Sequence, residues 1–133
     1  MRLWDPASGQ PVWGRQGHPE AVTAVSAVAV DGRHLVASAS DDHTIRLWDP
    51  ASGAPVATLF GHTAPVTGLC AVPRDGRELL ASTSADRTVR LWDPGTGAVV
   101  QVIPVHHRAL ACWYWHGTLV IGLDTGVLAV ELR

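Results

Sequence analysis

One five-residue string, Arg-Leu-Trp-Asp-Pro, occurs three times in this chain and constrains its fold more than any other feature. It stands at Arg2–Pro6, Arg46–Pro50 and Arg90–Pro94, so each copy follows the last by 44 residues. Residues 2–45 laid on residues 46–89 give 25 identities in 44 positions without a gap. A fixed period of about 20 to 50 residues predicts one structural unit that is built several times in succession.

Short β-prone runs separated by turn signals fill each repeat. The expected strands of one unit are Val66–Cys70, Glu78–Ser84, Thr88–Trp92 and Val99–Ile103. Asp75-Gly76, between the first two, is typical of a hairpin turn, and Asp31-Gly32 repeats it 44 residues earlier. No stretch of useful length has the 3.6-residue period of a helix. The sequence therefore predicts an all-β chain.

A Gly-His pair begins each of the first two repeats and a Trp-Asp pair ends each of them. Gly17-His18 recurs as Gly61-His62, and the third copy keeps His106 in register but has Val105 in place of glycine. A period of about 40 to 45 residues with this start and end is typical of the four-stranded blade of a β-propeller. On these residues the chain resembles the WD-repeat propeller family over nearly its whole length.

The resemblance implies an open arc of about three blades, an incomplete ring over residues 1–133 with repeats at about 6–49, 50–93 and 94–131. Propellers close with about 4 to 8 blades. Met1 stands where the other repeats have Ile45 and Val89, which suggests an internal start and missing upstream blades. We therefore expect the C-terminal part of a larger WD-repeat protein, or two copies that join into a six-bladed ring, and not a closed monomer.

The family's repeat carries a hydrogen-bonded tetrad of Trp, Ser or Thr, His and Asp, and the resemblance assigns one tetrad to each of two blades. The two sets are His18, Ser38, Asp42 and Trp48, and His62, Ser82, Asp86 and Trp92. An indole N–H only donates, a hydroxyl donates and accepts, an imidazole passes a bond on, and a carboxylate accepts. Four such groups can therefore satisfy one another when they are buried.

Ser, His and Asp in one set also raise the alternative of a nucleophilic triad. A triad needs an exposed nucleophile and an oxyanion hole, and the chain has no Gly-x-Ser-x-Gly elbow. The set occurs twice with a tryptophan attached, which is typical of a repeated packing module. We therefore predict structural tetrads, no enzymatic activity and no cofactor.

The last repeat loses most of the tetrad. His106 keeps the 44-residue spacing from His62, but measured from Asp124 by the pattern of the repeat, Val120 stands at the Ser position and Val130 at the Trp position. Because both members of the Ser–Trp bond become apolar, the loss costs less than the removal of one member. We expect His106 to face water and this blade to be the terminal one.

Histidines and aromatic residues cluster near the end of the sequence. His106, His107 and His116 raise the possibility of a metal site, but neither zinc-type spacing nor a completing ligand set accompanies them, so we predict no metal. Trp113 and Trp115 should share one strand face. Core packing is the favoured interpretation of this pair, and a binding patch is the alternative.

Family partners often dock on the narrow top face of the propeller, which the resemblance places just after the Gly-His turn and just before the tetrad Asp. The candidate binding residues there are Thr23, Asp41, Pro65, Thr67 and Leu123. We predict a non-catalytic scaffold that binds a protein or peptide. The alternatives are an enzyme that uses the central channel and a truncated gene product with no independent role.

Composition excludes several classes of partner. A net charge of −2 provides neither a basic surface for nucleic acid nor a polybasic patch for lipid, and the longest apolar stretch, Ala21–Val30, is too short to span a bilayer. Cys70 and Cys112 match no disulfide or zinc pattern and are expected to be partly buried thiols in a reducing cytoplasm. All ten cationic residues are Arg, which is typical of a GC-rich genome such as that of a bacterium.

Overall fold

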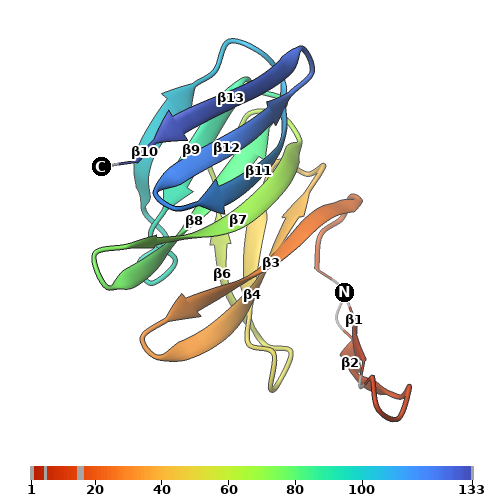
Figure 1. Ribbon diagram of the computed structural model, residues 1–133. Coiled ribbons are helices and arrows are strands. Elements are labelled where there is room, and N and C mark those ends of the chain that lie inside the picture. Colours follow the sequence, from red (N-terminus) through yellow and green to blue (C-terminus); the bar gives the residue numbers. More distant parts are fainter. Residues whose placement is uncertain (1, 5, 15–16, 133) are drawn as a thin grey trace.

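The computed structural model describes residues 2–4, 6–14 and 17–132, and every regular element among them is a strand (Figure 1). These ranges contain no helix, and so no helical segment that could cross a membrane is found in them. The predicted all-β class is confirmed. Met1, on which the expectation of an internal start rests, lies outside the described residues.

Two four-stranded antiparallel sheets form the centre of the molecule, and their strands pair in chain order. The first sheet contains β3 (Val22–Val30), β4 (Arg33–Ser40), β5 (Ile45–Trp48) and β6 (Pro55–Leu59). The middle sheet contains β7 (Val66–Arg74), β8 (Arg77–Ser84), β9 (Thr88–Trp92) and β10 (Val99–Pro104).

The last sheet has three strands, β11 (Ala109–Trp115), β12 (Thr118–Leu123) and β13 (Gly126–Glu131). A separate antiparallel pair is made by β1 (Arg2–Trp4) and β2 (Pro11–Gly14) near the N-terminus. The strands β3, β7 and β11 begin the three larger sheets and lie next to one another (Figure 1). The sheets thus form an open arc of about three propeller blades, as the sequence predicts.

Tight hairpin turns connect the first two strands of each larger sheet. Asp31 and Gly32 have φ angles of 49° and 80°, and Asp75 and Gly76 have angles of 52° and 77°. Two consecutive left-handed residues define the type I′ turn, which suits the twist of the flanking strands. His116-Gly117 makes the same turn in the last sheet, with φ angles of 44° and 85°.

Two apolar clusters hold the three sheets together, one at each interface. The first lies between the first and middle sheets and includes Leu47, Leu69 and Trp92. The second lies between the middle and last sheets and includes Leu91 and Ile121. The middle sheet therefore buries both of its faces.

Candidate functional site

In the first sheet, four side chains form a continuous chain of hydrogen bonds. The Trp48 indole N–H donates to Ser38 Oγ at 2.9 Å, and Ser38 Oγ lies 2.8 Å from His18 Nε2. His18 Nδ1 lies 2.8 Å from Asp42 Oδ2. Ser38 is on β4 and Trp48 ends β5, while His18 precedes β3 and Asp42 follows β4, so the four groups connect the strands with the loops at one end of the sheet.

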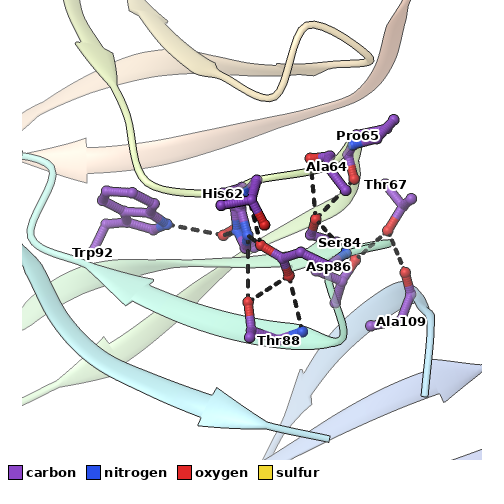
Figure 2. Close-up of polar contacts among 12 residues, drawn as sticks. His62, Ala64, Pro65, Thr67, Ser84, Asp86, Thr88, Trp92 and Ala109 are labelled. Carbon is purple, nitrogen blue, oxygen red and sulfur yellow. Dashed lines mark hydrogen bonds and ion pairs between the residues drawn. The ribbon is translucent and has the colours of Figure 1, made fainter. Parts of the chain in front are cut away.

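The middle sheet repeats this arrangement, as Figure 2 shows. Trp92 Nε1 donates to Ser82 Oγ at 2.9 Å, Ser82 Oγ lies 2.6 Å from His62 Nε2, and His62 Nδ1 lies 2.7 Å from Asp86 Oδ2. The Ser82, His62 and Trp92 residues are buried. The structure therefore brings together both sets of four residues that the family resemblance assigns.

The chemistry of the four groups fixes the direction of the bonds. A carboxylate can only accept, so His62 Nδ1–H donates to Asp86. With one ring proton on Nδ1, a neutral imidazole accepts at Nε2, and the Ser82 hydroxyl donates there while it accepts from Trp92. The hydroxyl is fully buried and its hydrogen is already used, so it has no access to a substrate. This arrangement supports a structural network and not a nucleophile.

Threonines that follow each tetrad Asp complete its hydrogen bonding. The Thr88 backbone N–H and hydroxyl donate to Asp86 Oδ1 at 2.9 and 2.6 Å, and Thr44 makes the same two bonds to Asp42 Oδ1 at the same distances. Sequence reasoning missed this threonine, although it occurs at the same place in both repeats. Burial alone would raise the pKa of Asp86, but the bonds from Thr88 and His62 outweigh it and leave the pKa below its usual value.

The imidazole of His62 is held in its neutral form. Burial lowers its pKa, and the nearby charge of Arg90 adds to this effect, while Asp86 opposes them without reversing the direction. A neutral ring is the form that the bond from Ser82 requires.

The glycine before each tetrad His makes room for the tryptophan ring. A Cβ on Gly17 would lie 2.6 Å from two ring carbons of Trp48. A Cβ on Gly61 would lie 2.7 Å from Arg90 Nη1 and 3.2 Å from Trp92. The glycine thus allows the chain to pass directly over the tryptophan ring of the same tetrad.

Threonine hydroxyls also link neighbouring sheets. Thr23 Oγ1 donates to the carbonyl of Val66, and Thr67 Oγ1 donates to the carbonyl of Ala109 at 2.6 Å. Because the two bonds are equivalent, Ala109 occupies in the last sheet the position of Val66 in the middle sheet. The offset here is 43 residues and not the 44 of the earlier repeats.

This offset corrects the assignment of the tetrad in the last sheet. Val105, and not His106, stands at the position of His62. The register of β12 against β11 and β13 likewise places Ile121, and not Val120, opposite the neighbours that correspond to those of Ser82. Val105 and Ile121 are buried in the second apolar cluster, and Val130, at the Trp92 position, packs against it. Apolar residues therefore replace the His, Ser and Trp of the network.

His106 is exposed, as the sequence predicts, but the physical reason differs from the predicted one. It occupies the position of Thr63, outside the tetrad, and has a positive φ of 63°. The segment from the end of β9 to the start of β11 is one residue shorter than the segment from the end of β5 to the start of β7, which an ungapped 44-residue spacing could not reveal.

The candidate top-face residues lie at the end of the sheets where the threonine bonds are made. Asp41 N–H donates to the Ala21 carbonyl, Ala85 N–H to that of Pro65, and Asp124 N–H to that of Arg108. These equivalent bonds place Asp124 at the position assigned to Leu123, which instead pairs with Ala109.

The five predicted binding residues differ in their exposure and bonding. Asp41 and Thr23 are exposed, whereas Pro65, Thr67 and Leu123 are half-buried. The hydroxyls of Thr23 and Thr67 are used between sheets. This end of the arc also carries two charged side chains, Arg108 and Asp124, which the sequence prediction did not include.

The aromatic run on β11 is arranged differently from the favoured expectation. Trp113 and Trp115 share one face, as alternation requires, but they are 65% and 58% exposed, so the core-packing interpretation is wrong for both. Their rings lie 6.0 Å apart between centroids. Tyr114 points the other way and packs against the second apolar cluster.

The described part of the chain does not place the side chains that a metal site would need close together. No group of three or more His, Cys, Asp and Glu side chains is placed there to hold an ion. His116 instead forms a hairpin turn and packs against Trp115, with ring centroids 4.4 Å apart.

Cys70 and Cys112 lie together, which sequence spacing did not reveal. Both are free and half-buried, and their sulfur atoms are 3.1 Å apart.

Comparisons with known proteins agree with this geometry. Residues 9–49 and 53–93, more than half of the chain, match the family model of the WD domain, G-beta repeat. No curated protein matches the chain. Among solved structures, the WD40 beta propeller domain of Doa1 is similar in fold, with a TM-score of 0.81 and 24% identity over 96% of this chain and 42% of that one. The chain thus spans less than half the length of that protein chain, and by its repeats it belongs to the WD40 repeat family.

Proposed function

We propose that this chain is a non-catalytic scaffold for protein association, located in the cytoplasm, and that the exposed face of β11–β13 is its principal contact surface. WD40 propeller domains commonly serve as interaction scaffolds, which supports the general role. The buried and mutually bonded tetrads support the absence of chemistry. The surface itself carries the more specific part of the proposal.

The exposed face of the last sheet has the character of an interface between blades. Trp113, Trp115 and Val127 occupy the positions of Cys70, Val72 and Val89 in the middle sheet. In the middle sheet these positions pack against the last sheet, and Val72 and Val89 are fully buried. In the last sheet the same positions are 65%, 58% and 74% exposed. This equivalence is the observation that carries the proposal.

A face of this kind is suited to contact with another propeller blade. Large exposed apolar patches mark interaction sites, and Trp is enriched among residues that dominate binding energy. β13 pairs with β12 alone among the described strands, so its second edge is open to a fourth strand. The partner we propose is therefore a propeller blade, supplied by further WD repeats or by a second copy of this chain.

A second copy could supply the required surface. Val25 on β3 is 63% exposed, although its counterpart in the middle sheet, Leu69, lies in the first apolar cluster. The first sheet thus presents the opposite side of a blade interface. Two copies joined by these faces would bring together about six blades, within the range in which propellers close.

Light scattering on the purified chain at increasing concentration tests the proposal. We expect self-association for the original chain, as dimers if two copies close a ring or as larger aggregates if other blades are required. Trp113→Ser with Trp115→Ser should restore the monomer. Phe60→Ser, which removes another exposed aromatic residue outside this face, is the matched control and should not. A monodisperse monomer at all concentrations would contradict the proposal.

A further inference from the structure

The two cysteines of the chain face each other across the interface between the middle and last sheets. Cys70 is on β7 and Cys112 on β11, 42 residues apart in sequence, and the Cys112 sulfur lies 3.1 Å from the Cys70 sulfur. Both side chains pack at the border of the second apolar cluster. They do not occupy equivalent positions in their strands, because Cys70 points toward the last sheet and Cys112 points back toward the middle sheet.

The backbone holds the two strands close at this point. A Cβ on Gly68, two residues before Cys70, would lie 2.7 Å from Thr83 Oγ1 and 3.0 Å from the Ala111 Cα atom, so the glycine lets the two strands lie close together here. The bond from Thr67 Oγ1 to the Ala109 carbonyl fixes the same strands on the other side of Gly68. At the interface between the first and middle sheets, the corresponding positions hold Ser26 and Leu69, so a thiol pair is specific to the last interface.

We propose that Cys70 and Cys112 are a disulfide-forming site, which a low-molecular-weight disulfide oxidises to join the last sheet covalently to the middle sheet. A disulfide bond is about 2.05 Å long, so the two sulfur atoms must approach by about 1 Å. Rotation of the two side chains about their Cα–Cβ bonds is the movement we propose for this approach.

The chemistry proceeds by thiol–disulfide exchange. The Cys70 thiolate attacks one sulfur of the small disulfide and releases one small thiolate, which leaves a mixed disulfide on Cys70. Cys112 then loses its proton and attacks the Cys70 sulfur, and the second small thiolate leaves. The protein loses two electrons and two protons, and the small disulfide is reduced to two thiols. The Cys112 S–H bond to Cys70 lowers the pKa of Cys70 and, together with burial, raises that of Cys112, which favours this order of attack.

Oxidation would change how the last sheet is attached. In the reduced chain, apolar contacts and hydrogen bonds connect it to the middle sheet. The disulfide would close a long loop and restrict the unfolded chain, which stabilises the folded one. In a reducing cytoplasm the site would remain a dithiol and would respond only to an oxidising change.

The test is equilibration of the full chain in buffers of increasing oxidised-to-reduced glutathione ratio, followed by acid quenching, intact mass measurement and peptide mapping. We expect a monomeric product that has lost two hydrogens, a cross-linked peptide containing Cys70 and Cys112, and a rise in Tm on the order of 10 °C. Cys112→Ser with Ala129→Cys is the matched control. It keeps two thiols but moves one to an exposed position on β13, two strands away from β11 in the sheet.

The outcomes separate this proposal from the proposed scaffold function. Only glutathione adducts or intermolecular dimers in the original chain, or a disulfide that forms equally well in the control, would overturn it. An internal disulfide without a rise in Tm would overturn the stabilising role. The mass and peptide-mapping results do not depend on whether the exposed face of the last sheet binds a partner, because those products are analysed after denaturation.

Discussion

The middle and last sheets are successive copies of the same repeat unit, but they differ in how many of their strand faces are buried. In β8 of the middle sheet, all six residues from Leu79 to Ser84 are buried, since the strand has neighbours on both faces. In β12 of the last sheet, burial alternates, with Leu119 and Ile121 buried and Val120 only half-buried. The difference arises because, among the described residues, no further sheet covers the second face of the last sheet.

The same comparison explains where the tetrad is found. In the middle sheet, His62 and Ser82 are buried polar groups, and each is satisfied by the network. In the last sheet, Val105 and Ile121 fill the corresponding space with apolar atoms and leave no buried donor or acceptor to satisfy. Replacing all the partners of a bond can be nearly neutral, whereas removing one is costly. The last sheet therefore keeps its packing without the network.

Removal of the tetrad carboxylate should have the largest effect. We expect Asp86→Ala to lower the free energy of unfolding by about 3 kcal/mol or more, because His62 loses its acceptor and Thr88 loses both of its bonds. Thr125→Ala, at the corresponding exposed position of the last sheet, should change it by less than about 0.5 kcal/mol. Urea unfolding measures both, and equal losses would contradict the contrast between the sheets.

Replacing tetrad residues of the middle sheet with apolar ones, as in the last sheet, should have an intermediate effect on the free energy of unfolding. Ser82→Ala should cost about 1–3 kcal/mol, because it leaves the Trp92 indole and the His62 ring nitrogen without their shared partner. The pair His62→Val with Ser82→Ile, which copies the last sheet, should cost less than the sum of the two single changes. Urea unfolding of the original chain, of His62→Val, of Ser82→Ile and of the double variant gives the coupling energy. Strict additivity would show that the two residues do not act as one network.

Acidification should produce a smaller and gradual loss of stability. Because the pKa of folded His62 is lowered, the unfolded chain binds a proton more readily, and stability falls as the pH decreases below about 6.5. The lowered pKa values of Asp42 and Asp86 add a further loss below about pH 4. Thermal unfolding between pH 8 and 5 should show a fall that is reduced in His62→Gln but retained in His106→Gln. The same profile in all three chains would contradict the role of His62.

The repeat period predicted the strands and the turns, because those features recur at constant spacing, and the resemblance to the WD-repeat family assigned both tetrads. The repeat period failed where the spacing changed. One residue fewer before β11 moves Val105 into the position of His62, and a comparison at 44 residues assigns His106 instead. The contact between Cys70 and Cys112 was also hidden, because it joins non-equivalent positions and depends on which way each strand faces. Trp113 and Trp115 were correctly placed on one face, but alternation alone cannot show whether a neighbour covers it.

Amide hydrogen exchange of the purified chain at two concentrations tests the central claim most directly, namely that the last sheet is a blade with an uncovered interface. We predict slow exchange in β8 and β9 at both concentrations. In β13 and β11 we predict fast exchange at low concentration and slower exchange at high concentration, as another blade covers their exposed face and pairs with the free edge. Exchange in the last sheet that is as slow as in β8 when the chain is dilute, or that does not change with concentration, would contradict the account.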